Sequence, residues 1–96
     1  MSDVDREALL RAVVSGDGGL NVSVTVHRQL AGQRSFIPAQ AIVEAIRSGA
    51  RAADPQGVPG HTMYTIGASY GRSRGALEVL VEEASGQIRH VLYRRG

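Results

Sequence analysis

The chain has 96 residues, a formal net charge of +2 and a hydrophobic content of 43%. These values fit one globular domain with a modest core, residues 1–96, and not a disordered chain. The absence of cysteine excludes disulfide partners and thiolate zinc sites. No apolar run reaches the length of a membrane-spanning segment and no signal-peptide pattern opens the chain, so we expect a soluble protein.

All 11 basic residues are arginine. Codon bias in a GC-rich genome explains this as well as a functional reason does. The functional reason is that guanidinium groups bind phosphate in a bidentate manner. The stretch 84–96 contains three arginines and no acid, and Arg72 and Arg74 form a second basic cluster. Basic clusters of this kind suit a polyanion.

The first half of the chain predicts helices around one strand. Residues 3–14 combine an acidic start, in which position 2 or 3 can cap, with an apolar stripe, which is typical of a helix. Strict alternation over residues 20–27 predicts a strand. A short helix is predicted over residues 27–34. A clearer helix spans residues 36–49, with proline near its start and glycine at its end.

The second half predicts a small sheet. Residues 50–61 show no periodicity and predict a long loop, which is often functional or mobile. A strand is expected over residues 62–66, followed by a Gly- and Arg-rich connection. Two alternating runs, 76–83 and 88–95, predict a hairpin. The expected fold is α+β, with N-terminal helices packed on a small antiparallel sheet that ends in this hairpin.

A two-residue hairpin loop at positions 85 and 86 would place Glu82 opposite Arg89, Val81 opposite His90 and Glu78 opposite Tyr93. This register pairs opposite charges and matches apolar residues. It puts His90 on one face with the following apolar residues: Leu77, Val79, Val81, Ile88 and Leu92.

A histidine on an apolar face is most often a core residue. Arg94, however, follows His90 on the same predicted face, and a strand does not readily bury an imidazole and a guanidinium together. We therefore expect this end of the face to open into a cleft. Of the other histidines, His27 ends the first strand or begins the next helix, and His61 lies in the loop as the weakest candidate.

The three histidines lack metal-ligand spacing, and the sequence has no P-loop, dinucleotide fingerprint or serine elbow. We therefore expect no metal and no cofactor. Histidine with arginine, threonine and tyrosine suits cleavage of a phosphodiester in RNA. One imidazole would deprotonate the ribose 2′-OH, an acid would protonate the leaving 5′-oxygen, and arginines would stabilise the transition state. Tyrosines can stack on unpaired bases.

Three further motifs resemble one protein family. His27 precedes the helix "FIPAQAIVEAIRSG", Thr62-Met63-Tyr64 opens a strand, and "VLVEEASGQIRHVLYR" closes the run as a hairpin. The run from His27 to Arg94 resembles the small toxin ribonucleases of the barnase–EndoU–colicin–RelE superfamily. The likeness is greatest to the toxin domains of contact-dependent inhibition and other polymorphic toxin systems.

The chain also departs from that pattern. Relatives often carry arginines where this chain has Ala31 and Ser35, and Arg28 and Arg34 stand beside those positions. A threonine is common where His90 stands, so His90 could replace a hydroxyl as the catalytic partner.

The resemblance implies a toxin delivered from a secreted or surface effector into the cytoplasm of a target cell. It would cleave tRNA or another RNA and be neutralised by an immunity protein. The expected catalytic residues, with the two histidines close together and sharing the acid and base roles, are His27, His90, Arg34, Arg94, Thr62 and Tyr93. The residues expected to bind the rest of the RNA are Arg28, Tyr64, Tyr70, Arg72, Arg74 and Arg95.

We expect the immunity protein to present an acidic surface to a cationic cleft lined by Arg34, Arg72, Arg74, Arg94 and Arg95. The alternatives are a non-catalytic RNA- or protein-binding module, such as an antitoxin or adaptor, and a small structural domain whose arginines reflect codon bias alone. Cleavage of RNA in the presence of EDTA separates the first hypothesis from both alternatives.

Overall fold

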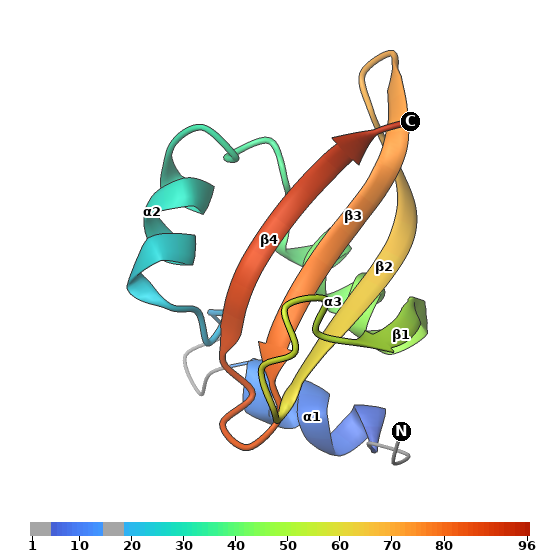
Figure 1. Cartoon of the computed structure of the whole chain (residues 1–96). Coiled ribbons are helices and arrows are strands. Elements are labelled where there is room, and N and C mark those ends of the chain that lie inside the picture. The colour runs from blue at the N-terminus through green and yellow to red at the C-terminus, as the bar shows by residue number, and fades with distance from the viewer. Residues whose placement is uncertain (1–4, 15–18) are drawn as a thin grey trace.

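A computed structural model describes residues 5–14 and 19–96. Within these residues, three helices and a four-stranded antiparallel sheet form an α+β fold, as the sequence predicts (Figure 1). The helices are α1 (Arg6–Val13), α2 (Val24–Ala31) and α3 (Ala39–Ser48). The strands, which pair in chain order, are β1 (Ala50–Ala53), β2 (His61–Tyr70), β3 (Ser73–Glu82) and β4 (Ile88–Arg95).

The helices leave one face of the sheet open. Figure 1 shows α3 behind the sheet, α2 beside β4, and the loop between β1 and β2 in front. The core lies between the sheet and the helices. Its fully buried side chains include Val13, Val26, Ile42, Ile46, Tyr64, Leu77, Val79, Val81, Ile88 and Val91.

The two predicted long helices are confirmed where the structure describes them. Asp5 caps α1, since its Oδ1 accepts hydrogen bonds from the backbone N–H groups of Glu7 (3.0 Å) and Ala8 (3.3 Å). The predicted cap positions 2 and 3 lie outside the described residues. Helix α3 starts after Pro38 and ends at Gly49. A Cβ at Gly49 would lie 2.4 Å from the Ala45 carbonyl oxygen and 2.8 Å from that of Thr65, so glycine allows α3 to meet β2 closely.

The strand predicted over residues 20–27 is wrong, because its second half, residues 24–27, belongs to α2. The Ser23 side chain caps this helix by accepting a hydrogen bond from the Val26 N–H at 3.2 Å. Only Leu20 and Val22 form isolated bridges, the latter to Ile88. The β-branched residues favour a strand by propensity, but the cap and the burial of Val26 in the core override this weak preference.

The loop and connection predictions are also wrong at their ends. Residues 50–53 form β1, and His61 is already the first residue of β2. The stretch predicted as a connection continues β2 to Tyr70 and starts β3 at Ser73. The turn between these strands contains Gly71, with φ at +63°.

The predicted register of the final hairpin is wrong, and this error moves side chains between faces. The observed pairs are Leu77 with Tyr93, Leu80 with His90 and, after an irregularity, Val81 with Ile88. Arg89 is therefore an extra residue in β4, the arrangement of a β-bulge. Ile88 and Val91 both reach the core, whereas His90 lies on the opposite, open face and does not share the face of Leu77.

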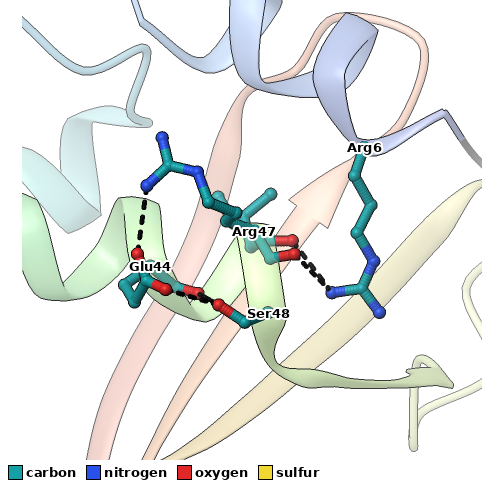
Figure 2. Close-up of polar contacts among 5 residues, drawn as sticks. Arg6, Glu44, Arg47 and Ser48 are labelled. Carbon is teal, nitrogen blue, oxygen red and sulfur yellow. Dashed lines mark hydrogen bonds and ion pairs between the residues drawn. The ribbon is translucent and has the colours of Figure 1, made fainter.

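Arg6 ties α1 to the end of α3 (Figure 2). Its Nη1 donates to the carbonyl oxygens of Ile46 (3.2 Å), Arg47 (3.2 Å) and Gly49 (2.8 Å). A cation at a helix C-terminus also meets the negative end of the helix dipole. On the exposed side of α3, Arg47 pairs with Glu44 at 3.0 Å. Hydrogen bonds from the Ser48 hydroxyl, the larger cause, and from Arg47 hold the pKa of Glu44 below its usual value.

We predict that Arg6→Ala lowers the free energy of unfolding by about 1.5–3 kcal/mol, because charged hydrogen bonds to carbonyl groups are lost. Arg47→Ala is the matched control, since an exposed ion pair contributes about 1 kcal/mol or less. Urea denaturation of both variants measures the difference. Equal losses would show that the three carbonyl contacts of Arg6 do not hold the two helices together.

Candidate active site

A groove lies on the open face of the sheet, where β2, β3 and β4 meet the loop of residues 54–60. Its volume is about 490 Å³, within the range of ligand-binding clefts. The apolar part of the lining comes from Met63, Leu80 and Leu92, together with two loop residues. The side chains that could carry chemistry are His61, Glu78, Arg89, His90 and Arg94.

The loop that walls the groove is held by internal hydrogen bonds. Asp54 is 7% exposed, and its Oδ1 accepts a hydrogen bond from the Gln56 N–H at 3.0 Å. The Asp54 carbonyl accepts from the Gly57 N–H, and the Gly60 carbonyl accepts from the Glu83 N–H, both at 2.8 Å. The loop is thus fastened to itself and to the end of β3.

His90 stands at the edge of the groove in a half-buried position. Burial lowers the pKa of His90 below its ordinary value of 6.5, and the positive charge of Arg34 lowers it further. Glu78 acts in the opposite direction on this pKa, and Arg94 in the same direction as Arg34. The ring is therefore neutral near pH 7, the state in which an imidazole accepts a proton.

His61 brings a second imidazole to the same groove from β2. Its Nδ1 lies 3.0 Å from the carbonyl oxygen of Pro59, which can only accept, so Nδ1 carries a hydrogen. Nε2 lies 3.9 Å from a carboxylate oxygen of Glu82. Since β2 and β4 flank β3, the backbones of His61 and His90 are separated by two strand spacings. They are also offset by two residues along β3, because His61 pairs with Glu82 and His90 with Leu80, so the separation is roughly 12 Å.

A carboxylate and a guanidinium form the third part of the site. Arg94 Nε donates to Glu78 Oε2 at 2.6 Å. The Glu78 side chain is 19% exposed, whereas that of Arg94 is 65% exposed. Arg89, the extra residue of the bulge, also lines the groove, and its Nη1 donates to Gln87 at 2.7 Å. Guanidinium groups in this position can contact an anion that enters between the two imidazoles.

Several predicted site residues do not reach this groove. His27 and Arg28 are exposed on α2 and are not among the groove residues, so the predicted pairing of His27 with His90 is not what the structure forms. Thr62 is buried and donates its hydroxyl hydrogen to Glu83. Tyr64 is fully buried in the core, so it cannot stack on a base as predicted.

Arg34 has a structural partner instead of an open position. Its Nη1 donates to the Gln29 side chain (2.9 Å) and to the Val91 carbonyl oxygen (2.5 Å). These bonds fasten the segment after α2 to β4. The guanidinium thus acts on His90 through its charge, as the lowered pKa shows.

The remaining predicted residues gather at the far end of the β2–β3 hairpin. The residues there are Tyr70, Arg72, Arg74, Tyr93 and Arg95. Of the five arginines predicted to line a single cationic cleft, only Arg94 lines the groove. The predicted cleft is therefore divided into two places, and the groove itself mixes cations with Asp54 and Glu78.

His61 is the functional candidate that the sequence prediction undervalued. The apparent loop before it concealed the start of β2, so its position on the same face as Met63 was not recognised. Extending the predicted strand by one residue, from 62 back to 61, would have placed His61 in the alternating pattern on the side of Met63. The register error similarly hid Glu78 as a neighbour of His90.

Comparisons with protein families, with curated proteins and with solved structures find no match to this chain. Across residues 5–14 and 19–96, no group of three or more His, Asp or Glu side chains is placed to hold a metal ion. In the same part of the chain, no helix has both the length and the apolar character needed to cross a membrane.

Proposed function

We propose that this protein is an endoribonuclease that cleaves RNA at the open-face groove without a metal ion. The observation that supports this most directly is the presence of two imidazoles, from β2 and β4, on one groove that also contains arginines. Two histidines on either side of a bound phosphate provide a base and an acid for transfer of that phosphate.

The proposed reaction assigns the base role to His90, because its lowered pKa leaves it neutral. His90 takes the proton from the ribose 2′-OH, and the 2′-oxygen attacks phosphorus. The bond from phosphorus to the 5′-oxygen breaks, and the imidazolium form of His61 gives its proton to that oxygen. The products are a 2′,3′-cyclic phosphate and a free 5′-hydroxyl.

Other groups in the groove have supporting roles in this proposal. Arg94 and Arg89 stabilise negative charge on the phosphorane-like transition state. Glu78 orients Arg94 through their 2.6 Å contact. The apolar lining from Leu80 and Leu92 provides a surface for the ribose or base beside the reacting phosphate.

The biological setting is part of the proposal. The resemblance to small toxin ribonucleases supports a toxin that acts on RNA inside a target cell and is neutralised by an immunity protein. Because the arginines are divided between two places, an acidic surface on the immunity protein would cover either the groove or the end of the β2–β3 hairpin. The alternative function is a non-catalytic RNA- or protein-binding module.

We predict that the purified protein cleaves total tRNA or a single-stranded RNA in excess EDTA and leaves 2′,3′-cyclic phosphate ends. Mass spectrometry of the products identifies these ends. His27→Ala is the matched control and should retain the wild-type rate, because His27 lies outside the groove. Binding of RNA without cleavage, by a protein that retains its fold, would support the binding module instead.

A further inference from the structure

Three aromatic rings pack edge to face at the end of the β2–β3 hairpin, away from the loop that walls the groove. The ring centroids of Phe36 and Tyr70 are 5.2 Å apart, those of Tyr70 and Tyr93 are 4.8 Å apart, and those of Phe36 and Tyr93 are 6.0 Å apart. Phe36 is 48% exposed. These three residues, which we call the aromatic tip, border a hollow of about 430 Å³, large enough for a small ligand.

One polar atom in the aromatic tip lacks a partner. The Tyr93 hydroxyl lies 3.0 Å from the Ser73 hydroxyl. The Tyr70 hydroxyl, by contrast, is buried and has no hydrogen-bond partner among the described residues. Burial raises the pKa of Tyr70, so the hydroxyl remains protonated and can donate. Most buried polar groups in native proteins are hydrogen-bonded, so this donor is available for an acceptor on a ligand.

Three arginines surround the aromatic tip. Arg72, Arg74 and Arg95 line an adjoining hollow of about 540 Å³ that shares Tyr70 with the first one. Among the residues that the structure describes, no acidic side chain lines either hollow. Within residues 5–14 and 19–96, none of these guanidinium groups forms an ion pair or hydrogen bond through its side chain. Their charge is thus available for an anion.

We propose that the aromatic tip is a second RNA contact, which binds one unstacked base and its flanking phosphates in a single-stranded region. This inference extends the proposed ribonuclease function, and it rests on that function for the identification of the ligand as RNA. The exposed Phe36 ring provides a stacking surface, the Tyr70 hydroxyl donates to an acceptor on the base, and the arginines contact phosphates. Stacking on aromatic rings combined with cationic grooves is how proteins bind single strands.

The position of the aromatic tip defines the length of the substrate. Tyr93 and Arg95 follow His90 by three and five residues in β4, which is roughly 10–17 Å along a strand. Since Tyr93 pairs with the core residue Leu77, both side chains lie on the helix-covered face, opposite His90. Figure 1 shows the C-terminus of β4 and the β2–β3 turn at the same end of the sheet. Arg74 and Arg94 lie on the open face at this end, as their pairing with Ser69 and Ala76 indicates. An RNA bound at both places would pass over these two arginines and around the end of the sheet to the aromatic tip, a path that an oligonucleotide can span and a dinucleotide cannot.

The first test measures binding by fluorescence anisotropy with a labelled oligouridylate of about ten residues, made uncleavable by 2′-O-methyl groups. Single-stranded binding loses about 0.7 in the slope of log K against log salt for each phosphate contact removed. Arg72→Ala combined with Arg95→Ala should therefore reduce the slope by about 1.4. Arg11→Ala combined with Arg47→Ala removes the same charge elsewhere. An equal reduction in this control pair would overturn the proposal, because only net charge would then matter.

The second test examines stacking. The chain has no tryptophan, so Phe36→Trp introduces a single indole at the aromatic tip, which can be excited at wavelengths where tyrosine does not absorb. We expect the oligouridylate to quench its emission and inorganic polyphosphate to leave it unchanged. Phe36→Leu, which keeps an apolar side chain, should weaken RNA binding roughly 5- to 150-fold, the loss of one stacked base. Unchanged emission with RNA, together with unchanged affinity of Phe36→Leu, would exclude the stacking site.

Cleavage assays keep this proposal distinct from the ribonuclease proposal. If wild type binds through the aromatic tip but never cleaves RNA, the aromatic tip stands as a binding site and the ribonuclease proposal fails. If wild type cleaves a dinucleotide as efficiently as the longer RNA, and the variants at Phe36, Arg72 and Arg95 cleave normally, the aromatic tip is excluded and the ribonuclease proposal stands.

Discussion

We expect His90→Ala to lower the rate of RNA cleavage by about 10²–10⁴-fold, the usual contribution of a general acid or base. The variant should fold normally, because His90 lies on the open face and is not part of the core. Cleavage rates and thermal melts, measured on the same preparation, give both quantities. A loss of activity that follows a loss of folded protein would show that His90 has a structural role only.

The pH dependence gives an independent check of this role. A base must be unprotonated, so activity should fall as the pH drops through the pKa of His90. Because burial and Arg34 lower this pKa, the acidic limb should lie below 6.5, the ordinary value for histidine. Arg34→Gln removes a positive charge that disfavours the protonated ring, so it should move the limb to higher pH. If the acidic limb does not move in Arg34→Gln, the charge of Arg34 does not affect the group whose protonation limits activity.

The same shift has a consequence for stability. With a lower pKa in the folded state, His90 binds fewer protons when folded than when unfolded. Its contribution to stability is therefore complete above pH 6.5 and is lost as the pH falls through the lowered folded value. In His90→Ala this part of the pH dependence should be absent.

The second large effect concerns the turn between β3 and β4. We expect Gly86→Ala to lower the free energy of unfolding by about 2–5 kcal/mol, from backbone strain and a steric clash together. Gly86 has φ at +72°, and a Cβ there would lie 2.5 Å from the Ala12 Cβ and 2.8 Å from the Ala12 carbonyl carbon. Asn21 bridges the same two segments by donating to the carbonyl groups of Ala12 (3.3 Å) and Ser85 (3.0 Å).

Gly57→Ala is a matched control for Gly86→Ala. Gly57 has φ at +77°, but a Cβ there would meet nothing within 4 Å. This variant should lose only the cost of the left-handed backbone, about 1–2 kcal/mol. Urea denaturation of both variants isolates the contact between the turn and α1. If both variants lose the same free energy of unfolding, the turn at Gly86 does not pack closely against Ala12.

The sequence predicted those parts of the fold that have their own local signals. Helix α3 has an apolar stripe that ends at Gly49, as predicted, whereas it starts only after Pro38 and not at residue 36. The segment from Val24 to Ala31 was misassigned because its residue types favour a strand, while its helical state depends on Ser23 and on burial of Val26 in the core. Burial against distant residues leaves no mark in a local pattern.

The candidate site was harder to predict because it depends on register. The sequence indicated His90 and Arg94 as neighbours that open onto a cleft, and both line one groove. The loop of four residues, 83–86, in place of two shifts the register by two residues and keeps Ile88 on the face of Val81. The face of His90 was wrong because Arg89 is an extra residue between the pairs Val81–Ile88 and Leu80–His90. A shift of one residue exchanges the two faces of a strand. His61 and Glu78 became neighbours of His90 only through that pairing.

The extra residue in β4 also determines where this strand can change in length. Removing Arg89 would leave Ile88, His90 and Val91 in regular alternation, so the imidazole would keep its side of the sheet while the groove lost one cation. Removing Val91 instead would turn Leu92 and Arg94 toward the helices. Natural or designed deletions in this hairpin should therefore be tolerated at position 89 and rejected just after His90.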